Sequence, residues 1–164
     1  MSPNPYLPHV VVLPEDDADS DVANGFWLQV EWNRQRQMQV LPVAGGWEKV
    51  LDRFKSDHVK KMERYPARFM VLLIDFDDKK DRLDHAKRAI PPHLADRVFV
   101  LGALSEPEAL KPDLGVYEKI GSDMAKDCRE GTDKIWRHPF LRHNASELDR
   151  LRGHIRPMLF PSNG

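Results

Sequence analysis

The stretch that decides the fold reads FMVLLIDFD and spans residues 69–77. Its first six residues form a continuous apolar run, which is typical of a strand buried on both faces of a parallel sheet. Two aspartates, Asp75 and Asp77, follow at the point where this strand should end. The stretch therefore predicts the most clearly marked strand of the chain, with acidic side chains at its carboxyl end.

Three further strands are predicted around this one. Residues 10–13 and 98–101 are short apolar runs, and residues 38–43 alternate and contain Pro42. Because proline cannot donate a ladder hydrogen bond, we expect residues 38–43 to take a less central place in the sheet. Segments with apolar residues at helical spacing separate the strands. The alternation predicts an α/β fold, a Rossmann-like four-stranded parallel sheet with helices on both faces.

Residues typical of helix starts and ends mark the bounds of the helices between these strands. We expect the first helix to use Asp19 or Ser20 as its N-cap. The second should follow Gly45-Gly46 and end before Pro66, and the third should end near Pro91-Pro92.

After the fourth strand the pattern changes to a helical tail. A loop or short helix is predicted over residues 104–112 and a helix over residues 117–128. A capping box at residues 146–149 should open a last helix. Cys128 lies on the apolar side of its helix, so we expect a small buried hydrophobe. The resulting division is a flexible lead at residues 1–8, a core at 9–112, and a C-terminal helical extension at 113–164 packed on that core within one domain.

Composition narrows the class of protein. The 164 residues are 41% hydrophobic and 31% charged, with a formal net charge of -1, so global charge does not select nucleic acid or an anionic membrane. A single cysteine rules out an internal disulfide framework and favours a reducing, cytoplasmic location. No signal peptide is predicted at the start, and no apolar run approaches the roughly 20 residues that span a bilayer, so no membrane partner is expected.

Carboxylates gather at the predicted ends of the first and third strands. Glu15 follows the first strand, and Asp75 and Asp77 follow the third. All strands of a parallel sheet end on the same side, so these groups should converge if the two strands are neighbours. Unpaired carboxylates at such close range repel one another unless some are protonated or a cation neutralises them, and Mg²⁺ or Mn²⁺ suits their oxygens. The alternative is a set of solvated acids that face helix N-termini.

These residues resemble the TOPRIM domain, the metal-binding module of topoisomerases, primases and overcoming-lysogenization-defect (OLD) nucleases. That family places a glutamate after its first strand and an Asp-x-Asp after its third, here Glu15 and Asp75-Phe76-Asp77. The OLD-type branch often adds an acid four residues after the glutamate, which falls on Asp19. It also carries an acid after the fourth strand, for which we choose Glu108.

The resemblance covers residues 10–110, with two departures. Asp16 stands where the family commonly has glycine, and Lys79 stands where topoisomerases carry a third acid. The resemblance thus implies a stand-alone, OLD-nuclease-like TOPRIM protein of a bacterial defence or mobile-element setting.

The activity implied by the resemblance is phosphodiester hydrolysis in DNA or RNA with Mg²⁺ or Mn²⁺, with an ATPase or other protein as a possible partner. One ion would be held by Glu15 and Asp19 and another by Asp75 and Asp77. The implied catalytic residues are Glu15, Asp75 and Asp77, and the implied metal ligands are Glu15, Asp19, Asp75, Asp77 and Glu108.

The alternative function is a non-catalytic regulatory or interaction module, either an inactive TOPRIM domain or a response-regulator receiver. Residues 15–17 resemble the acidic pair of a receiver, Asp75 its phospho-accepting aspartate, and Lys111 its lysine. However, Lys111 follows the fourth strand directly, and a receiver leaves Asp77 unexplained. The receiver therefore ranks below the TOPRIM hypothesis.

The tail contains a basic aromatic segment that reads WRHPFLRHN over residues 136–144. Its arginines, Arg137 and Arg142, are candidates for phosphate binding beside the acidic site. The other interpretation is a docked loop in which Trp136 and Phe140 fill core space and the arginines form a solvated rim.

Overall fold

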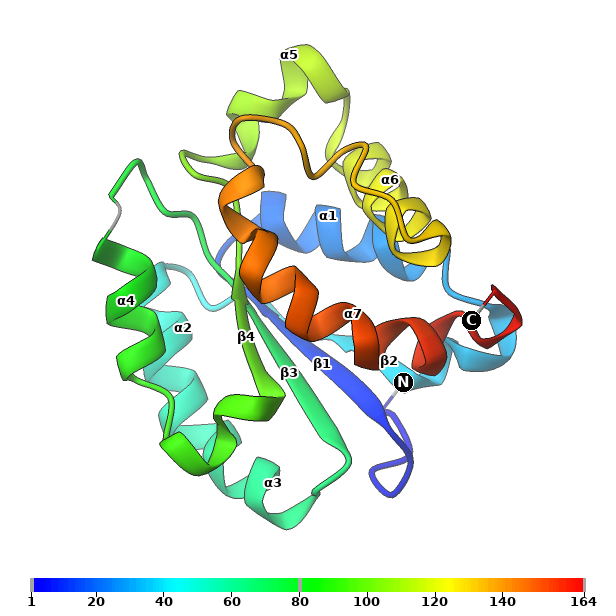
Figure 1. Ribbon diagram of the computed structural model, residues 1–164. Coiled ribbons are helices and arrows are strands. Elements are labelled where there is room, and N and C mark those ends of the chain that lie inside the picture. The colour runs from blue at the N-terminus through cyan, green and yellow to red at the C-terminus, as the bar shows by residue number, and fades with distance from the viewer. Residues whose placement is uncertain (1, 80, 164) are drawn as a thin grey trace.

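The computed structural model describes residues 2–79 and 81–163 and shows helices layered on both faces of a parallel sheet (Figure 1). The four strands lie in the order β2-β1-β3-β4, and every neighbouring pair is parallel. This confirms the predicted fold class and the edge position of the second strand. The strands are β1 (His9–Pro14), β2 (Met38–Val40), β3 (Arg68–Leu73) and β4 (Val98–Leu101).

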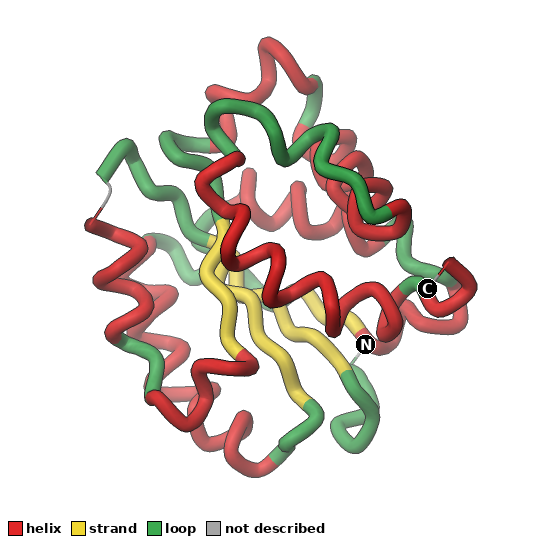
Figure 2. Tube along the Cα trace, in the orientation of Figure 1, coloured by secondary structure: helices red, strands yellow, loops and turns green. Residues whose placement is uncertain are grey.

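Helices and short turns connect the strands and form the tail (Figure 2). The α-helices are α1 (Asp17–Trp27), α2 (Trp47–Arg53), α3 (Val59–Arg64), α4 (Asp81–Arg88), α5 (Lys111–Leu114), α6 (Tyr117–Glu130) and α7 (Ala145–Leu159). A π-helical turn, Phe54–His58, joins α2 to α3. Single 3-10 turns cover Trp32–Gln37, Pro92–Arg97, Pro107–Leu110, Arg142–Asn144 and Pro161–Asn163.

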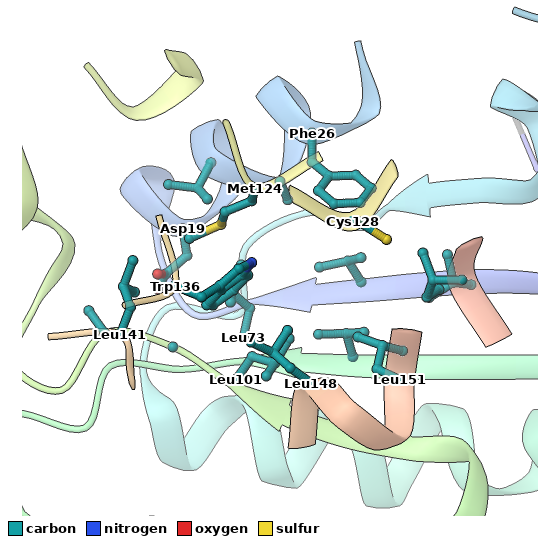
Figure 3. Close-up of a pocket in the computed structure, with 18 of the residues that line it drawn as sticks. Asp19, Phe26, Leu73, Leu101, Met124, Cys128, Trp136, Leu141, Leu148 and Leu151 are labelled. Atoms are coloured by element: carbon teal, nitrogen blue, oxygen red, sulfur yellow. The ribbon is translucent and has the colours of Figure 1, made fainter. Parts of the chain in front are cut away.

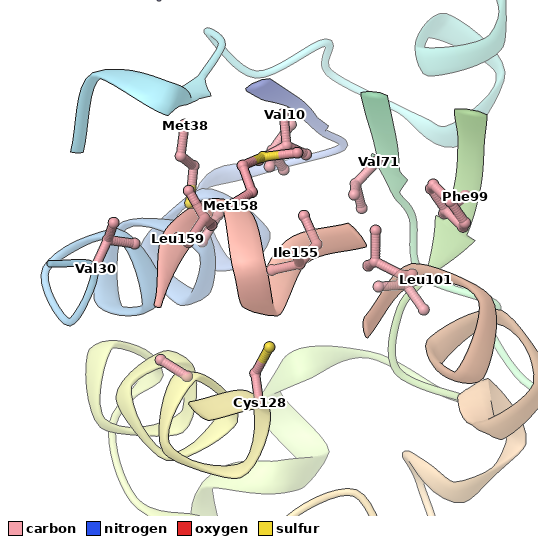
Figure 4. Packing of buried hydrophobic residues seen from close by; sticks show 14 of the residues in the cluster. Val10, Val30, Met38, Val71, Phe99, Leu101, Cys128, Ile155, Met158 and Leu159 are labelled. Atoms are coloured by element: carbon pink, nitrogen blue, oxygen red, sulfur yellow. The ribbon is translucent and has the colours of Figure 1, made fainter. Parts of the chain in front are cut away.

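Alternate side chains of each strand are buried on opposite faces of the sheet. In β1, Val10 and Val12 face the layer of α1, α6 and α7, while Val11 and Leu13 face α2, α3 and α4. This alternation follows from the period of two in a strand, and it explains why the strands read as continuous apolar runs. Figure 4 shows the first of these cores, where Ile155 and Met158 of α7 approach the sheet.

Close backbone packing holds α1 against α6. A Cβ atom on Gly121 would collide with the carbonyl oxygen of Val22, and one on Gly25 would collide with the carbonyl oxygen of Glu118. The missing side chains let the two helix backbones approach directly. The tail therefore fixes the position of α1, the helix that follows β1.

A buried carboxylate ties the edge strand β4 to the helices beside it. Glu147 of α7 is 2% exposed and accepts hydrogen bonds from the backbone N–H of Val100 at 2.9 Å and from Lys87 of α4 at 2.8 Å. Arg150 adds a further bond at 3.0 Å. Burial alone would raise the pKa of Glu147, but these donors lower it overall.

Three local predictions are wrong or incomplete. The N-cap of α1 is Asp16, whose side chain accepts from the Asp19 N–H at 3.0 Å, so Asp19 lies inside the first turn. There is no capping box at Ser146, because the Arg142–Asn144 turn runs into α7 at Ala145 and Glu147 points to β4 instead. The strand predicted over residues 38–43 ends at Val40, although the Leu41 N–H still donates to the Val12 carbonyl at 2.9 Å.

Two other expectations concern burial and membranes. Cys128 is 5% exposed, and burial raises the pKa of its thiol to about 11, which confirms it as a buried apolar group. Among the helices of residues 2–79 and 81–163, none has the length and apolar character needed to cross a bilayer.

We predict that Glu147→Ala lowers the free energy of unfolding by about 2 kcal/mol near neutral pH, because it leaves the buried Val100 N–H without an acceptor. The lowered pKa means that the contribution of Glu147 is present above its ordinary value of 4.5 and is lost as the pH falls further. Urea unfolding at several pH values measures both effects. Asp149→Ala, at an exposed position of the same helix, is the control and should change little; equal losses in the two variants would contradict the prediction.

Candidate metal centre

The ends of β1 and β3 lie side by side and bring Glu15 next to Asp75. The register pairs Pro14 with Leu73, and the Glu15 N–H donates to the Leu73 carbonyl at 2.9 Å. The side chain of Glu15 then turns toward β3, and its Oε2 accepts the Asp75 N–H at 2.6 Å. The two carboxyl groups are therefore adjacent because their strands are hydrogen-bonded neighbours.

The third carboxyl comes from the first turn of α1. Asp16 adopts an extended backbone conformation and caps the helix, which places Asp19 one turn later with its side chain directed inward. Asp19 is 3% exposed and Asp75 is 8% exposed. Glu15, Asp19 and Asp75 each offer an oxygen, and these atoms lie within 4.8 Å of one another. We call these three residues the acid triad.

Two oxygens of the acid triad are buried without a hydrogen-bond donor. Asp19 Oδ2 and Asp75 Oδ1 have no partner among the described residues. A buried polar atom without a partner is unfavourable, so the triad needs either protons or a cation.

The electrostatics of the triad favour protonation when no cation is bound. Burial, followed by the nearby charges of Asp16 and Glu15, raises the pKa of Asp75 to about 8. Burial, followed by the charges of Asp75 and Asp16, raises the pKa of Asp19 well above its usual range. The pKa of Glu15 is also raised, mainly by burial. Carboxyls that share a dry site cannot all ionise without a compensating charge.

A buried arginine supports the site without pairing with the triad. Arg82 of α4 is 8% exposed and donates to the backbone carbonyl of Asp75 at 2.7 Å. Its guanidinium also stacks 4.6 Å from the centre of the Trp47 ring. No sequence pattern singled out Arg82, because its role arises from the packing of α4 beside β3.

Asp77 lies outside the acid triad. Its φ of 50° and that of Asp78, 57°, place both residues in the left-handed region, which ends the extended alternation that would have put Asp77 beside Asp75. The Asp77 side chain is 65% exposed and lies 4.0 Å from Arg82. Asp77 is therefore an exposed carboxylate on the rim of the site.

The other predicted site residues are also at the surface. Glu108 is exposed in the Pro107–Leu110 turn and does not join the triad. Arg137 and Arg142 are exposed. The segment that carries Arg142 nevertheless lies beside the site, because Leu104, just beyond β4, donates to the Phe140 carbonyl at 2.8 Å.

The basic aromatic segment is partly a packing element. Trp136 and Phe140 are partly buried against an apolar cluster of α1, α6 and the turn after β4. His143 packs edge-on against Phe76, with ring centroids 5.1 Å apart. Phe76 directly follows Asp75, so the segment forms one wall next to the acid triad.

The donor set fits a hard divalent cation. Three carboxylates offer oxygen ligands, the preferred ligands of Mg²⁺ and Mn²⁺, and none of the three is neutralised by a direct ion pair among the described residues.

Comparison of the chain with models of protein families, with curated proteins and with solved structures found no match. The TOPRIM resemblance therefore stays a prediction, and the functional argument depends on the site itself.

We predict that Asp75→Asn stabilises the metal-free protein at pH 8 by about 1–3 kcal/mol, because it removes a buried carboxyl that must ionise. The raised pKa means that the folded wild type holds a proton that the unfolded chain releases above 3.8. Its stability should therefore fall as the pH rises from 3.8 to about 8. Urea unfolding in a chelator at pH 4 and pH 8 tests this.

Asp77→Asn is the matched control for this experiment, because it removes an exposed carboxyl two residues away. It should leave the pH dependence of the free energy of unfolding unchanged. A wild-type stability that rises steadily from pH 4 to pH 8 would contradict the assigned direction of the pKa shifts.

Proposed function

We propose that the acid triad binds Mg²⁺ or Mn²⁺ and that the chain uses this ion to hydrolyse phosphodiester bonds in nucleic acid. One observation carries the proposal. Three carboxyls from two neighbouring strand ends and a helix start converge in a buried site, and two of their oxygens have no hydrogen-bond partner within residues 2–79 and 81–163. This site lies at the carboxyl edge of a parallel sheet, where ligands of such folds bind.

The acid triad also lies where the order in which the chain adds strands to the sheet changes direction. From β1 the chain moves to β2 on one side, and it later returns to place β3 on the other side of β1. The connections at the ends of β1 and β3 therefore diverge, and this is the position at which folds of this class bind ligands. Glu15 and Asp75 follow these two strand ends.

When bound, the ion would supply Lewis-acid stabilisation of a phosphoryl oxygen and lower the pKa of water. The residues of the chain would hold the ion and orient its ligands. Glu15, Asp19 and Asp75 would hold the ion, and the Asp75 N–H would keep the Glu15 carboxylate oriented through its 2.6 Å bond. Arg82 would hold the backbone of Asp75 in place.

Asp77 and Arg142 would act from the rim. The exposed Asp77 carboxylate, 4.0 Å from Arg82, would take a proton from a water that attacks the phosphorus, as a general base. Arg142 belongs to the segment that lies beside the end of β4 and would bind a phosphate of the substrate. Since the formal net charge is -1, such local contacts must replace a global positive field.

Calorimetric titration with Mg²⁺ and Mn²⁺ tests the metal site. Wild type should bind one ion, whereas Glu15→Gln, Asp19→Asn and Asp75→Asn should each weaken binding at least about tenfold through loss of a ligand charge. Asp77→Asn should retain binding and thus separates the triad from the rim. Unchanged affinity in all three triad variants would overturn the metal site.

Cleavage of labelled single- and double-stranded DNA and RNA with Mn²⁺ tests the activity. Asp77→Asn should lower the rate of cleavage about 10²–10⁴-fold, the range for a lost general base, while metal binding persists. Metal binding by a wild type that cleaves none of these substrates would favour the non-catalytic alternative.

Arg142→Ala should weaken nucleic-acid binding and make the slope of log affinity against log salt shallower by about 0.9, the value for one phosphate contact. Fluorescence anisotropy with labelled DNA at several salt concentrations measures the slope. Arg64→Ala is the control, because this exposed arginine ends α3 just before the amino end of β3, at the opposite edge of the sheet. The same loss in both variants would indicate a diffuse charge effect.

A further inference from the structure

A cavity lies between the sheet and the layer formed by α1, α6 and α7. Its volume is about 120 Å³, and its walls are almost entirely apolar. Leu73 and Leu101 line it from the sheet, and Met124, Cys128 and Leu148 line it from the helices (Figure 3). Cavities of this order accept a molecule of the size of benzene, whereas a single water needs only about 10–15 Å³.

Two buried polar side chains interrupt the apolar walls. Asp19 lines the cavity next to the ring of Trp136 (Figure 3), and its Oδ2 has no partner among the described residues. Arg152 of α7 also lines it. Its terminal nitrogens bind Asp133 and the Thr132 carbonyl, but its buried Nε has no partner in the described part of the chain. The cavity therefore combines apolar walls with two side chains that carry a buried polar atom without a partner in the described residues.

We propose that this cavity binds a small uncharged molecule with a compact apolar body and a hydroxyl group, and that the hydroxyl contacts Asp19. A hydroxyl both donates and accepts, so it matches the Asp19 carboxyl whether or not that group carries a proton. The apolar body matches walls that offer no other hydrogen-bonding group except Arg152. A carboxylate ligand is disfavoured, because its charge would face the acid triad.

The binding site adjoins the acid triad but does not require a metal ion. Asp19 belongs to both, since it closes one end of the cavity and offers an oxygen to the triad. The inference therefore goes beyond the proposed hydrolytic function, and the two can fail separately. An occupied cavity would place a small apolar ligand directly behind one of the triad carboxyls.

Methyl NMR in a chelator tests the proposal, with benzyl alcohol as the probe and toluene as its counterpart without a hydroxyl. Benzyl alcohol should shift the methyl signals of Leu101 and Leu148, which line the cavity, and leave those of Leu51 and Leu94 unchanged. The latter two belong to the core on the opposite face of the sheet. Toluene should bind the same methyls about fivefold more weakly, the effect of one neutral hydrogen bond.

Two variants control for the location. Cys128→Phe and the smaller change Cys128→Met both extend a side chain into the cavity from α6, and each should abolish or weaken the shifts while the remaining methyl spectrum stays folded. Asp19→Ala should remove the preference for benzyl alcohol over toluene but keep toluene binding. No shift up to the solubility limit, shifts on both faces of the sheet, or equal affinity for the two probes in wild type would overturn the proposal.

Discussion

The hydrogen-bonded pairing of β1 with β3 is the constraint on which the candidate site depends. His9 to Pro14 align in parallel with Arg68 to Leu73, so two segments that are distant in the chain end at the same level of the sheet. The bond from the Asp75 N–H to Glu15 continues this ladder through a side chain. A one-residue slip of register would separate the two carboxyls and also move apolar residues to the wrong face, so packing and site are specified together.

Buried carboxylates serve opposite roles in two parts of the molecule. Glu147 is surrounded by donors from β4, α4 and α7, which lower its pKa and make it a structural link. Asp19 and Asp75 are just as buried but lack such donors, and their pKa values are raised. All three carboxyls are buried, so their pKa values differ because Glu147 receives hydrogen bonds from these donors and faces positive charges, whereas Asp19 and Asp75 do not. That contrast is the physical reason to regard the acid triad as a site for a ligand.

The helical tail contributes to the site although it supplies none of the triad carboxyls. Gly121 of α6 lets α1 approach closely, and α1 carries Asp19. α7 covers the sheet face on which the cavity lies. The segment between α6 and α7 places His143 against Phe76 beside the triad. The tail thus shapes both the acid triad and the cavity beside it.

The sequence by itself determined the α/β class, the parallel sheet, a less central place for β2 and the presence of acids at two strand ends. These follow from local periodicity and from the rule that parallel strands end on one side. Only the tertiary structure decided which acids meet. Asp19 joins the triad because Asp16 caps α1, and Asp77 leaves it because its backbone is left-handed. Arg82, Glu147 and the cavity depend on contacts between distant segments, which no local pattern specifies.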